Sequence, residues 1–119
     1  MQKSNIPPDD LIRLQHMLDA AQEAIGFAEG KYRPDLEIDR MLVLSLVKDI
    51  EIVGEAAYQT SEATRQKTPT IPWQDIIRMR HRLVHAYYEI DLDVLWRTVQ
   101  DDLPELAIQL AEFLSGETP

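Results

Sequence analysis

The amino-acid sequence predicts an all-α protein, an up-and-down bundle of four to five helices. It has only four glycines in 119 residues, and its apolar residues recur at steps of three and four, the spacing of one helical face. No segment shows the sustained alternation of apolar and polar residues that marks a half-buried strand. A chain of this length is typical of one domain, so we expect residues 1–119 to form a single bundle.

The first helix is expected to begin at Pro8 and to end before Gly30. Asp9 and Asp10 would lie in its first turn, where carboxylates meet the positive end of the helix dipole. The apolar face of this helix consists of residues at helical spacing: Leu11, Leu14, Leu18, Ala21, Ile25 and Ala28.

A second helix is expected from near Glu37 to about Ser61. Residues 41–47 are apolar nearly all round, which indicates a central helix or one shared with a partner. Gly54 lies inside it at a cost of about 1 kcal/mol relative to alanine, so we expect another backbone to approach closely there. Residues 63–71 are expected to form a polar connection.

Pro72 is expected to open a third helix, because a first-turn position does not need its missing N–H. The predicted inward stripe of this helix runs from Trp73 to Tyr87: Trp73, Ile76, Ile77, Arg80, Leu83, Val84 and Tyr87. The helix should fray around residues 87–90. Asp91 can then cap a fourth helix, which should run past Pro104 with a kink there or as two nearly collinear pieces.

Composition narrows the possible functions. The absence of cysteine excludes a disulfide scaffold, an iron–sulfur or zinc–thiolate site and a cysteine nucleophile. No apolar stretch approaches the ~20 residues needed to span a bilayer, and residues 1–5 lack a signal peptide's apolar segment, so we expect a soluble, cytoplasmic protein. With 12 basic and 21 acidic residues the net charge is −9, which repels nucleic acid and anionic lipid.

One segment departs from this acidic average. The 13 residues between Asp75 and Glu89 contain no acidic residue. They hold five of the chain's cationic or titratable side chains: Arg78, Arg80, His81, Arg82 and His85. An arginine beside a histidine suits phosphate chemistry, since guanidinium holds non-bridging oxygens while imidazole moves a proton. Because Arg80 falls on the predicted apolar stripe, its charge must be paired or must line a cleft.

Other interpretations of these residues remain open. Arginine-rich helices are mostly solvated faces, and His81 and His85, four residues apart, could instead bind a metal. Nearby carboxylates that would complete a metal site are lacking, so we expect neither metal nor cofactor. Glu51 and Glu55 are expected at a solvated or salt-bridged edge, and His16 at the surface.

The segment and its surroundings resemble the HEPN superfamily, and more narrowly the HepT-like (DUF86) toxins of prokaryotic toxin–antitoxin pairs. The family pattern of Arg, a polar residue, three further residues, His, one residue and Tyr falls on Arg80, His81, His85 and Tyr87. Flanking matches extend over essentially the whole chain: residues 53–57, residues 71–73, Asp91 and residues 101–104. One departure is His81, where many relatives have Asn.

The resemblance implies a metal-independent endoribonuclease acting on tRNA or mRNA as a homodimer, with the motifs of two protomers in one cleft. Arg80 and His85 would be catalytic, and Arg78, His81 and Arg82 would assist RNA binding. On an ideal helix Arg80 and His85 lie about 140° apart. Fraying near His85, or pairing across a two-fold axis, would therefore be needed to aim both at one phosphate.

The resemblance also implies a partner. Tyr87 corresponds to the tyrosine that a cognate minimal nucleotidyltransferase antitoxin modifies with AMP. Added phosphate beside Arg80 and His85 would fill the anion site and repel RNA. The antitoxin would bind the surface around residues 80–88.

Two further hypotheses compete with the nuclease. In the first, the chain is a non-catalytic companion subunit of a nucleotidyltransferase, and its basic segment binds nucleotide without cleaving RNA. In the second it is a structural dimerisation domain whose arginines pair with Asp91, Asp93 or Asp101.

Overall fold

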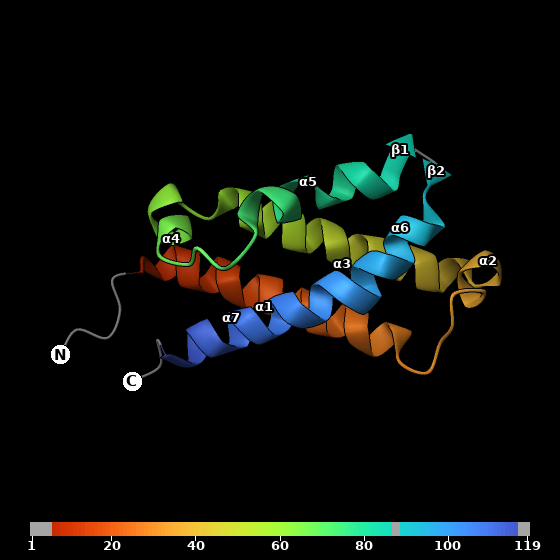
Figure 1. Ribbon diagram of the computed structural model, residues 1–119, viewed down its shortest axis with the longest axis horizontal. Helices are drawn as coiled ribbons and strands as arrows, with labels where there is room; N and C mark the ends of the chain where they lie inside the picture. The colour runs from red at the N-terminus through yellow and green to blue at the C-terminus, as the bar shows by residue number, and fades with distance from the viewer. Residues whose placement is uncertain (1–5, 87–88, 117–119) are drawn as a thin grey trace.

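The computed structural model describes residues 6–86 and 89–116, without the side chains of residues 84–86. It is an elongated bundle of antiparallel helices (Figure 1), which confirms the predicted all-α class. Its long helices are α1 (Pro8–Ala28), α3 (Arg40–Gln59), α5 (Trp73–Leu83) and the continuous run of α6 (Leu92–Arg97), η1 (Thr98–Asp102) and α7 (Leu103–Gly116). No described helix has the length and apolar character required to cross a membrane.

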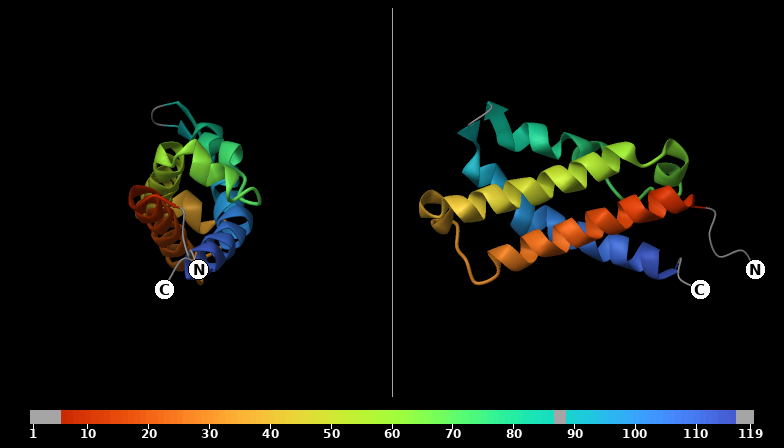
Figure 2. Two further views of the ribbon diagram at one scale, coloured as in Figure 1. Left: turned by 90° about the vertical axis from the view of Figure 1, so that its left-hand side faces the viewer. Right: turned by 180° about the vertical axis from the view of Figure 1, so that it is seen from behind.

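The core lies between α1, α3 and α7, with α5 packed alongside the C-terminal half of α3 (Figure 2). Its largest fully buried apolar side chains come from each of these helices: Leu14, Met17, Leu46, Ile50, Val53, Ile76, Leu83, Leu95, Val99, Leu103 and Leu110. Burial of this apolar surface is the main force that holds the bundle together.

The predicted second helix is divided in two. A short helix α2 (Asp35–Ile38) precedes α3, which begins at Arg40. Asp39 separates them, because its Oδ1 accepts a hydrogen bond from the Leu42 N–H at 3.0 Å and so caps α3. The region predicted as a polar connection contains a further short helix, α4 (Glu62–Gln66), which Ser61 caps by accepting from the Thr64 N–H.

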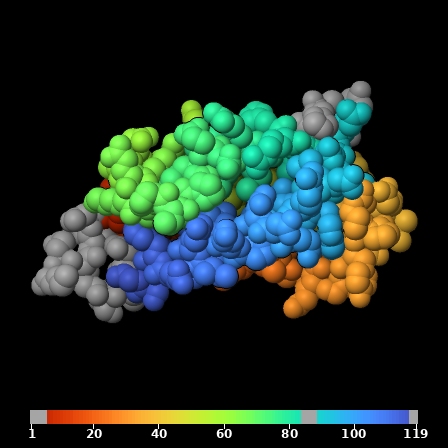
Figure 3. Space-filling model, viewed as in Figure 1, coloured from red at the N-terminus to blue at the C-terminus, as the bar shows by residue number. Residues whose placement is uncertain are grey.

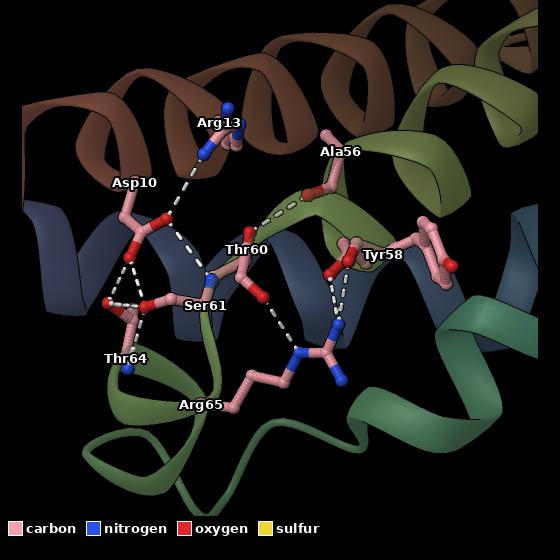
Figure 4. A network of polar contacts seen from close by, with 9 residues as sticks. Asp10, Arg13, Ala56, Tyr58, Thr60, Ser61, Thr64 and Arg65 are labelled. Carbon is pink, nitrogen blue, oxygen red and sulfur yellow. Dashed lines mark hydrogen bonds and ion pairs between the residues drawn. The ribbon is translucent and has the colours of Figure 1, made fainter.

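A buried carboxylate fixes the corner between α3 and α4 (Figure 4). Asp10 of α1 is 2% exposed and accepts hydrogen bonds from the Ser61 N–H and from the hydroxyls of Ser61 and Thr64. Burial raises the pKa of Asp10, but these hydrogen bonds outweigh burial, so its pKa lies below the usual value. Arg13 of α1 adds an ion pair to the same carboxylate at 3.4 Å.

The backbone of α5 approaches α3 closely at Gly54, as the sequence predicted. A Cβ built on Gly54 would lie 3.5 Å from the Ile76 carbonyl oxygen of α5. That separation is an ordinary van der Waals contact, so the α3–α5 crossing is close but leaves room for alanine. Packing alone therefore does not require a glycine at this position.

Helix α5 ends earlier than predicted. It stops at Leu83 and is followed by an antiparallel pair of very short strands, β1 (Val84–Ala86) and β2 (Glu89–Ile90). Strands of this length are too short to show alternation, so the sequence indicated only fraying. The Asp91 N–H donates to the Leu83 carbonyl at 2.7 Å, and the Asp91 side chain caps α6 as predicted, accepting from the Val94 N–H.

The fourth helix passes Pro104 by means of a π-helical turn. Proline lacks the N–H that the Gln100 carbonyl would accept in an α-helix, and the five residues of η1 lie just before it. The Leu103 N–H donates to the Thr98 carbonyl, a five-residue step that widens the turn. The helix is thus continuous from Leu92 to Gly116, and the wide turn takes the place of a break.

Candidate functional site

Helix α5 carries most of the predicted site residues, and its buried face matches the predicted inward stripe at Trp73, Ile76 and Leu83 but not at Arg80. Its buried side chains are Trp73, Ile76, Met79 and Leu83. Arg80 therefore does not lie on the inward stripe: its side chain is 51% exposed at the edge of that stripe. The prediction was wrong for Arg80 alone among these residues, because Met79, which it left out, occupies the inward position next to Arg80.

Arg80 and His81 face a groove of about 600 Å³ whose other walls are α1 and α3. These three helices lie side by side, with α3 in the middle, in the right-hand view of Figure 2. We call this the α3 groove. Its polar and aromatic lining comes from all three helices: Arg13, His16, Lys48, Glu51, Glu55, Tyr58, Gln59, Arg80 and His81.

An ion pair holds Arg80 at the wall of the α3 groove. Its Nε lies 2.9 Å from Oε2 of Glu51, one of the two carboxylates expected at a solvated or salt-bridged edge. The other, Glu55, accepts a hydrogen bond from Gln59 at 2.9 Å. Because Glu51 engages the Nε side of the guanidinium, the two Nη groups form the edge available for a bidentate contact with phosphate.

The opposite flank of α5 faces a second groove, of about 460 Å³, which we call the α7 groove. Figure 3 shows this side of the molecule, with α5 in green to teal above α6–α7 in blue. Its charged lining is mainly acidic: Asp75, Asp101, Asp102 and Glu105, with Arg82 and Arg97. Burial raises the pKa of the Asp102 carboxyl above its usual value, and nearby Arg82 opposes this.

The structure therefore separates the arginines that the sequence grouped together. Arg80 lines the α3 groove, whereas Arg82 lines the α7 groove and its Nη1 lies 3.8 Å from Oδ1 of Asp75. Arg78 is exposed and belongs to neither lining. The side chain of His85 and the whole of Tyr87 lie outside the described residues, so their predicted roles stay predictions.

Sequence reasoning missed several groove residues. His16 is exposed as predicted, but it also lines the α3 groove, together with Arg13, Lys48 and Tyr58. Arg13 and His16 are three residues apart and thus share a face of α1. Nothing in the sequence indicated that this face lies opposite α5.

The acidic partners of the α5 arginines also differ from those expected of a structural domain. Arg80 pairs with Glu51 and Arg82 with Asp75, while Asp93 pairs with Arg33 at 2.8 Å. Within residues 6–86 and 89–116, no cluster of three or more His, Asp or Glu side chains has an arrangement suited to a metal ion.

Comparison with known proteins identifies the family. The family pattern described as "Ribonuclease HepT-like" matches residues 17–113, which include all of α3 and α5 and the second half of α1. The chain belongs to the ribonuclease HepT-like family. The predicted resemblance to HepT-like proteins is thereby confirmed at the level of the family.

Several relatives of this HepT-like chain have names that refer to RNases. "Putative RNase TTE0752" of Caldanaerobacter subterraneus is 32% identical over 104 residues, which are 87% of this chain and 93% of that protein. "Probable ribonuclease HepT" of Thermococcus cleftensis is 38% identical over 72 residues, 60% of this chain and 66% of the relative. "Putative RNase MJ1380" of Methanocaldococcus jannaschii is 29% identical over 93 residues, 78% and 85% of the two chains. No solved structure matches significantly.

Proposed function

We propose that this protein is an endoribonuclease that cleaves RNA without a metal, as a single-domain homodimer. The observation that carries the proposal is the position of Arg80 at the wall of an open groove, in a chain of the HepT-like family. The RNase names of its relatives support the same class of reaction. Arg80 and His85 are the proposed catalytic residues, and His81, Arg78 and Arg82 are proposed to assist RNA binding.

The end of α5 supports a joint action of Arg80 and His85. If α5 continued as a regular helix, the two side chains would diverge by about 140°. The helix instead stops at Leu83, so residue 85 belongs to the extended backbone of β1. The angle of about 140° between Arg80 and His85 on a regular helix therefore does not apply. The end of α5 at Leu83 takes the place of the fraying that the sequence required to aim both residues at one phosphate.

The proposed reaction is a transesterification. His85 removes the proton of the substrate 2′-OH, the O2′–P bond forms, and the P–O5′ bond breaks. Arg80 stabilises the charge on the phosphorane-like transition state through its Nη edge. A proton from His85 of the second protomer, or from His81, reaches the leaving 5′-oxygen. The products are a 2′,3′-cyclic phosphate and a 5′-OH.

Incubation of the purified protein with total RNA tests this proposal. We expect fragments with cyclic-phosphate and 5′-OH ends, undiminished by EDTA, and no fragments from His85→Ala. Loss of cleavage in EDTA, or 5′-phosphate ends, would contradict the mechanism. Binding of nucleotide by a protein that never cleaves RNA would favour the non-catalytic companion subunit.

Exposed apolar side chains support the proposed homodimer. Ile38, the last residue of α2, and Met41, in the first turn of α3, are 84% and 79% exposed, and Leu44 of α3 is half exposed. A second copy would remove this surface from water, which is favourable. Sedimentation of the wild type and of Met41→Lys tests this: a dimer that the substitution does not weaken would place the interface elsewhere.

The proposed regulator is a cognate nucleotidyltransferase antitoxin that transfers AMP to Tyr87 and so neutralises a toxic, cytoplasmic nuclease. The charge added by each AMP would compete with RNA phosphate for Arg80. Co-incubation with the partner and ATP should add mass to the wild type and none to Tyr87→Phe. A Tyr87→Phe protein that nucleotide transfer still silences would refute the assignment.

A further inference from the structure

The α3 groove extends well beyond the residues of the proposed catalytic motif. Arg80 and His81 form only its α5 wall, and the remaining lining belongs to α1 and α3. The lining combines two features that single-stranded nucleic acid requires, which are cationic groups for the backbone and an exposed aromatic ring for a base. From this combination we infer that Lys48, Arg13 and Tyr58 form a binding track for single-stranded RNA next to the proposed catalytic residues.

Tyr58 is the aromatic component of this track. Its side chain is 67% exposed, although α3 buries the alanines at positions 56 and 57 immediately before it. Its backbone carbonyl is held by the Nη2 of Arg65 at 2.8 Å, and its ring points away from that polar network (Figure 4). The backbone beneath Tyr58 is thus fixed while the ring projects into solvent, which suits stacking on an unpaired base.

Lys48 and Arg13 are the cationic components. Lys48 is exposed on α3, and among the described side chains it forms no ion pair with a carboxylate. Arg13 is held at the α1 wall by Asp10, which the contacts from Ser61 and Thr64 keep ionised. Together with Arg80, these residues place three positive charges along the groove, against Glu51, Glu55 and the Asp10 carboxylate that pairs with Arg13.

The charge of the lining also argues against RNA binding in the α7 groove. The α7 groove carries four carboxylates against Arg82 and Arg97. In a protein of net charge −9, a polyanion is repelled from most of the surface, and the lining of the α3 groove, unlike that of the α7 groove, carries more cations than anions. The track thus deepens the proposed function, on which it rests, because it assigns residues to RNA flanking the cleaved phosphate.

Binding of a short, fluorescein-labelled 2′-O-methyl oligonucleotide tests the track without cleavage, because this probe lacks the 2′-OH nucleophile. We expect Tyr58→Ala to weaken binding at least about fivefold, the lower end for loss of one stacked base, and Tyr58→Phe to restore most of it. Tyr32→Ala is the matched control, since Tyr32 is 74% exposed and lies outside the groove. It should bind as the wild type does.

A salt titration tests the cationic side chains. Loss of one phosphate contact on a single strand lowers the slope of log K against log salt by about 0.7, and we expect this from Lys48→Gln. Lys31→Gln removes the same charge from an exposed residue outside the groove and should leave the slope unchanged. Both lysines are exposed, so neither substitution threatens folding.

The outcomes separate the track from the proposed function. If the wild type cleaves RNA while Tyr58→Ala and Lys48→Gln match their controls, the track is refuted and the nuclease stands. If the wild type binds the probe through Tyr58 and Lys48 but never cleaves RNA, the track is supported and the nuclease is refuted. Probe binding that depends on Arg97 instead would place the RNA in the α7 groove and overturn the inference.

Discussion

The two flanks of α5 face grooves of comparable size and opposite character. The α3 groove places Arg80 and His81 beside Arg13, Lys48 and the exposed ring of Tyr58. Across the same helix, the α7 groove places Arg82 among four carboxylates. The difference teaches that a run of alternating arginines on one short helix is not one patch, because residues two positions apart point about 160° away from each other. The charged residues of the neighbouring helix therefore determine the electrostatic environment of each arginine.

The largest expected effect on cleavage is that of substituting Arg80, and it tests whether the two flanks of α5 differ in function. Arg80→Gln should lower kcat about 100- to 1000-fold, because it removes the group that stabilises transition-state charge. Arg82→Gln, on the acidic flank, should lower kcat no more than about tenfold. Single-turnover cleavage of a defined RNA checks both variants. Equal losses from the two substitutions would mean that both flanks serve the reaction.

The next effect concerns the orientation of Arg80. Glu51→Gln removes the charge that holds Nε at 2.9 Å and should reduce kcat about tenfold with little change in KM, since a misplaced guanidinium costs transition-state stabilisation. Glu55→Gln removes an equal charge from the same groove, one turn further along α3, without touching Arg80.

Comparison of Glu55→Gln with Glu51→Gln therefore distinguishes the effect of orienting Arg80 from the effect of negative charge in the groove. It should leave kcat near the wild-type value and strengthen RNA binding slightly. If both glutamate variants bind and cleave RNA equally well, Glu51 does no more than contribute negative charge to the groove.

A smaller effect is expected on the acidic flank. The double substitution Asp101→Asn and Asp102→Asn should raise RNA affinity about two- to threefold at low salt, because it weakens the repulsion of a polyanion near the site. The gain should vanish at high salt, where these charges are screened. Oligonucleotide binding at two ionic strengths measures it, and a gain that persists at high salt would indicate a new direct contact.

The smallest effect on cleavage is expected from Asp49, which lines neither groove. This buried carboxyl on α3 contacts Glu23, and its burial, followed by that contact, raises its pKa to about 7. Between its ordinary pKa and about 7, the folded protein holds a proton that the unfolded chain has released. Its contribution to stability is therefore fully present at low pH and is lost as pH rises towards 7.

Asp49→Asn should thus raise the free energy of unfolding at pH 8 by on the order of 1–3 kcal/mol and flatten its decline with pH. Denaturant unfolding at several pH values measures this, with Asp19→Asn, an exposed carboxyl of α1, as the control. A decline of unchanged slope in Asp49→Asn would assign the pH dependence to other groups. Cleavage should change little, because Asp49 touches neither groove.

The sequence predicted the long helices and most of their buried residues, but not how the helices are interrupted. Apolar periodicity, the proline at the first position of α1 and the Asp91 cap located the starts of α1 and α6 correctly. It could not show that Asp39 divides the second helix, because an aspartate within a helical pattern is also compatible with a solvated face. The π-helical turn before Pro104 likewise depends on which carbonyls lose a donor, and periodicity does not report this.

The candidate site was predicted only along α5. Arg80 and His81 were found because they are adjacent in the sequence to other cations. Lys48 and Tyr58 were not found, since only the α1–α3–α5 packing brings them to the same groove. The alternation of Arg78, Arg80 and Arg82 suggested one positive patch, because spacing alone does not reveal that Asp101 and Asp102 lie across from Arg82.

Photo-crosslinking of a 2′-O-methyl oligonucleotide carrying 4-thiouridine, followed by peptide mass spectrometry, tests the central claim most directly. If RNA lies on the α3 flank of α5, adducts should fall on peptides that contain His16, Tyr58 or Arg80, and they should weaken in Tyr58→Ala. Adducts confined to residues 92–116, on the opposite flank, would contradict the account.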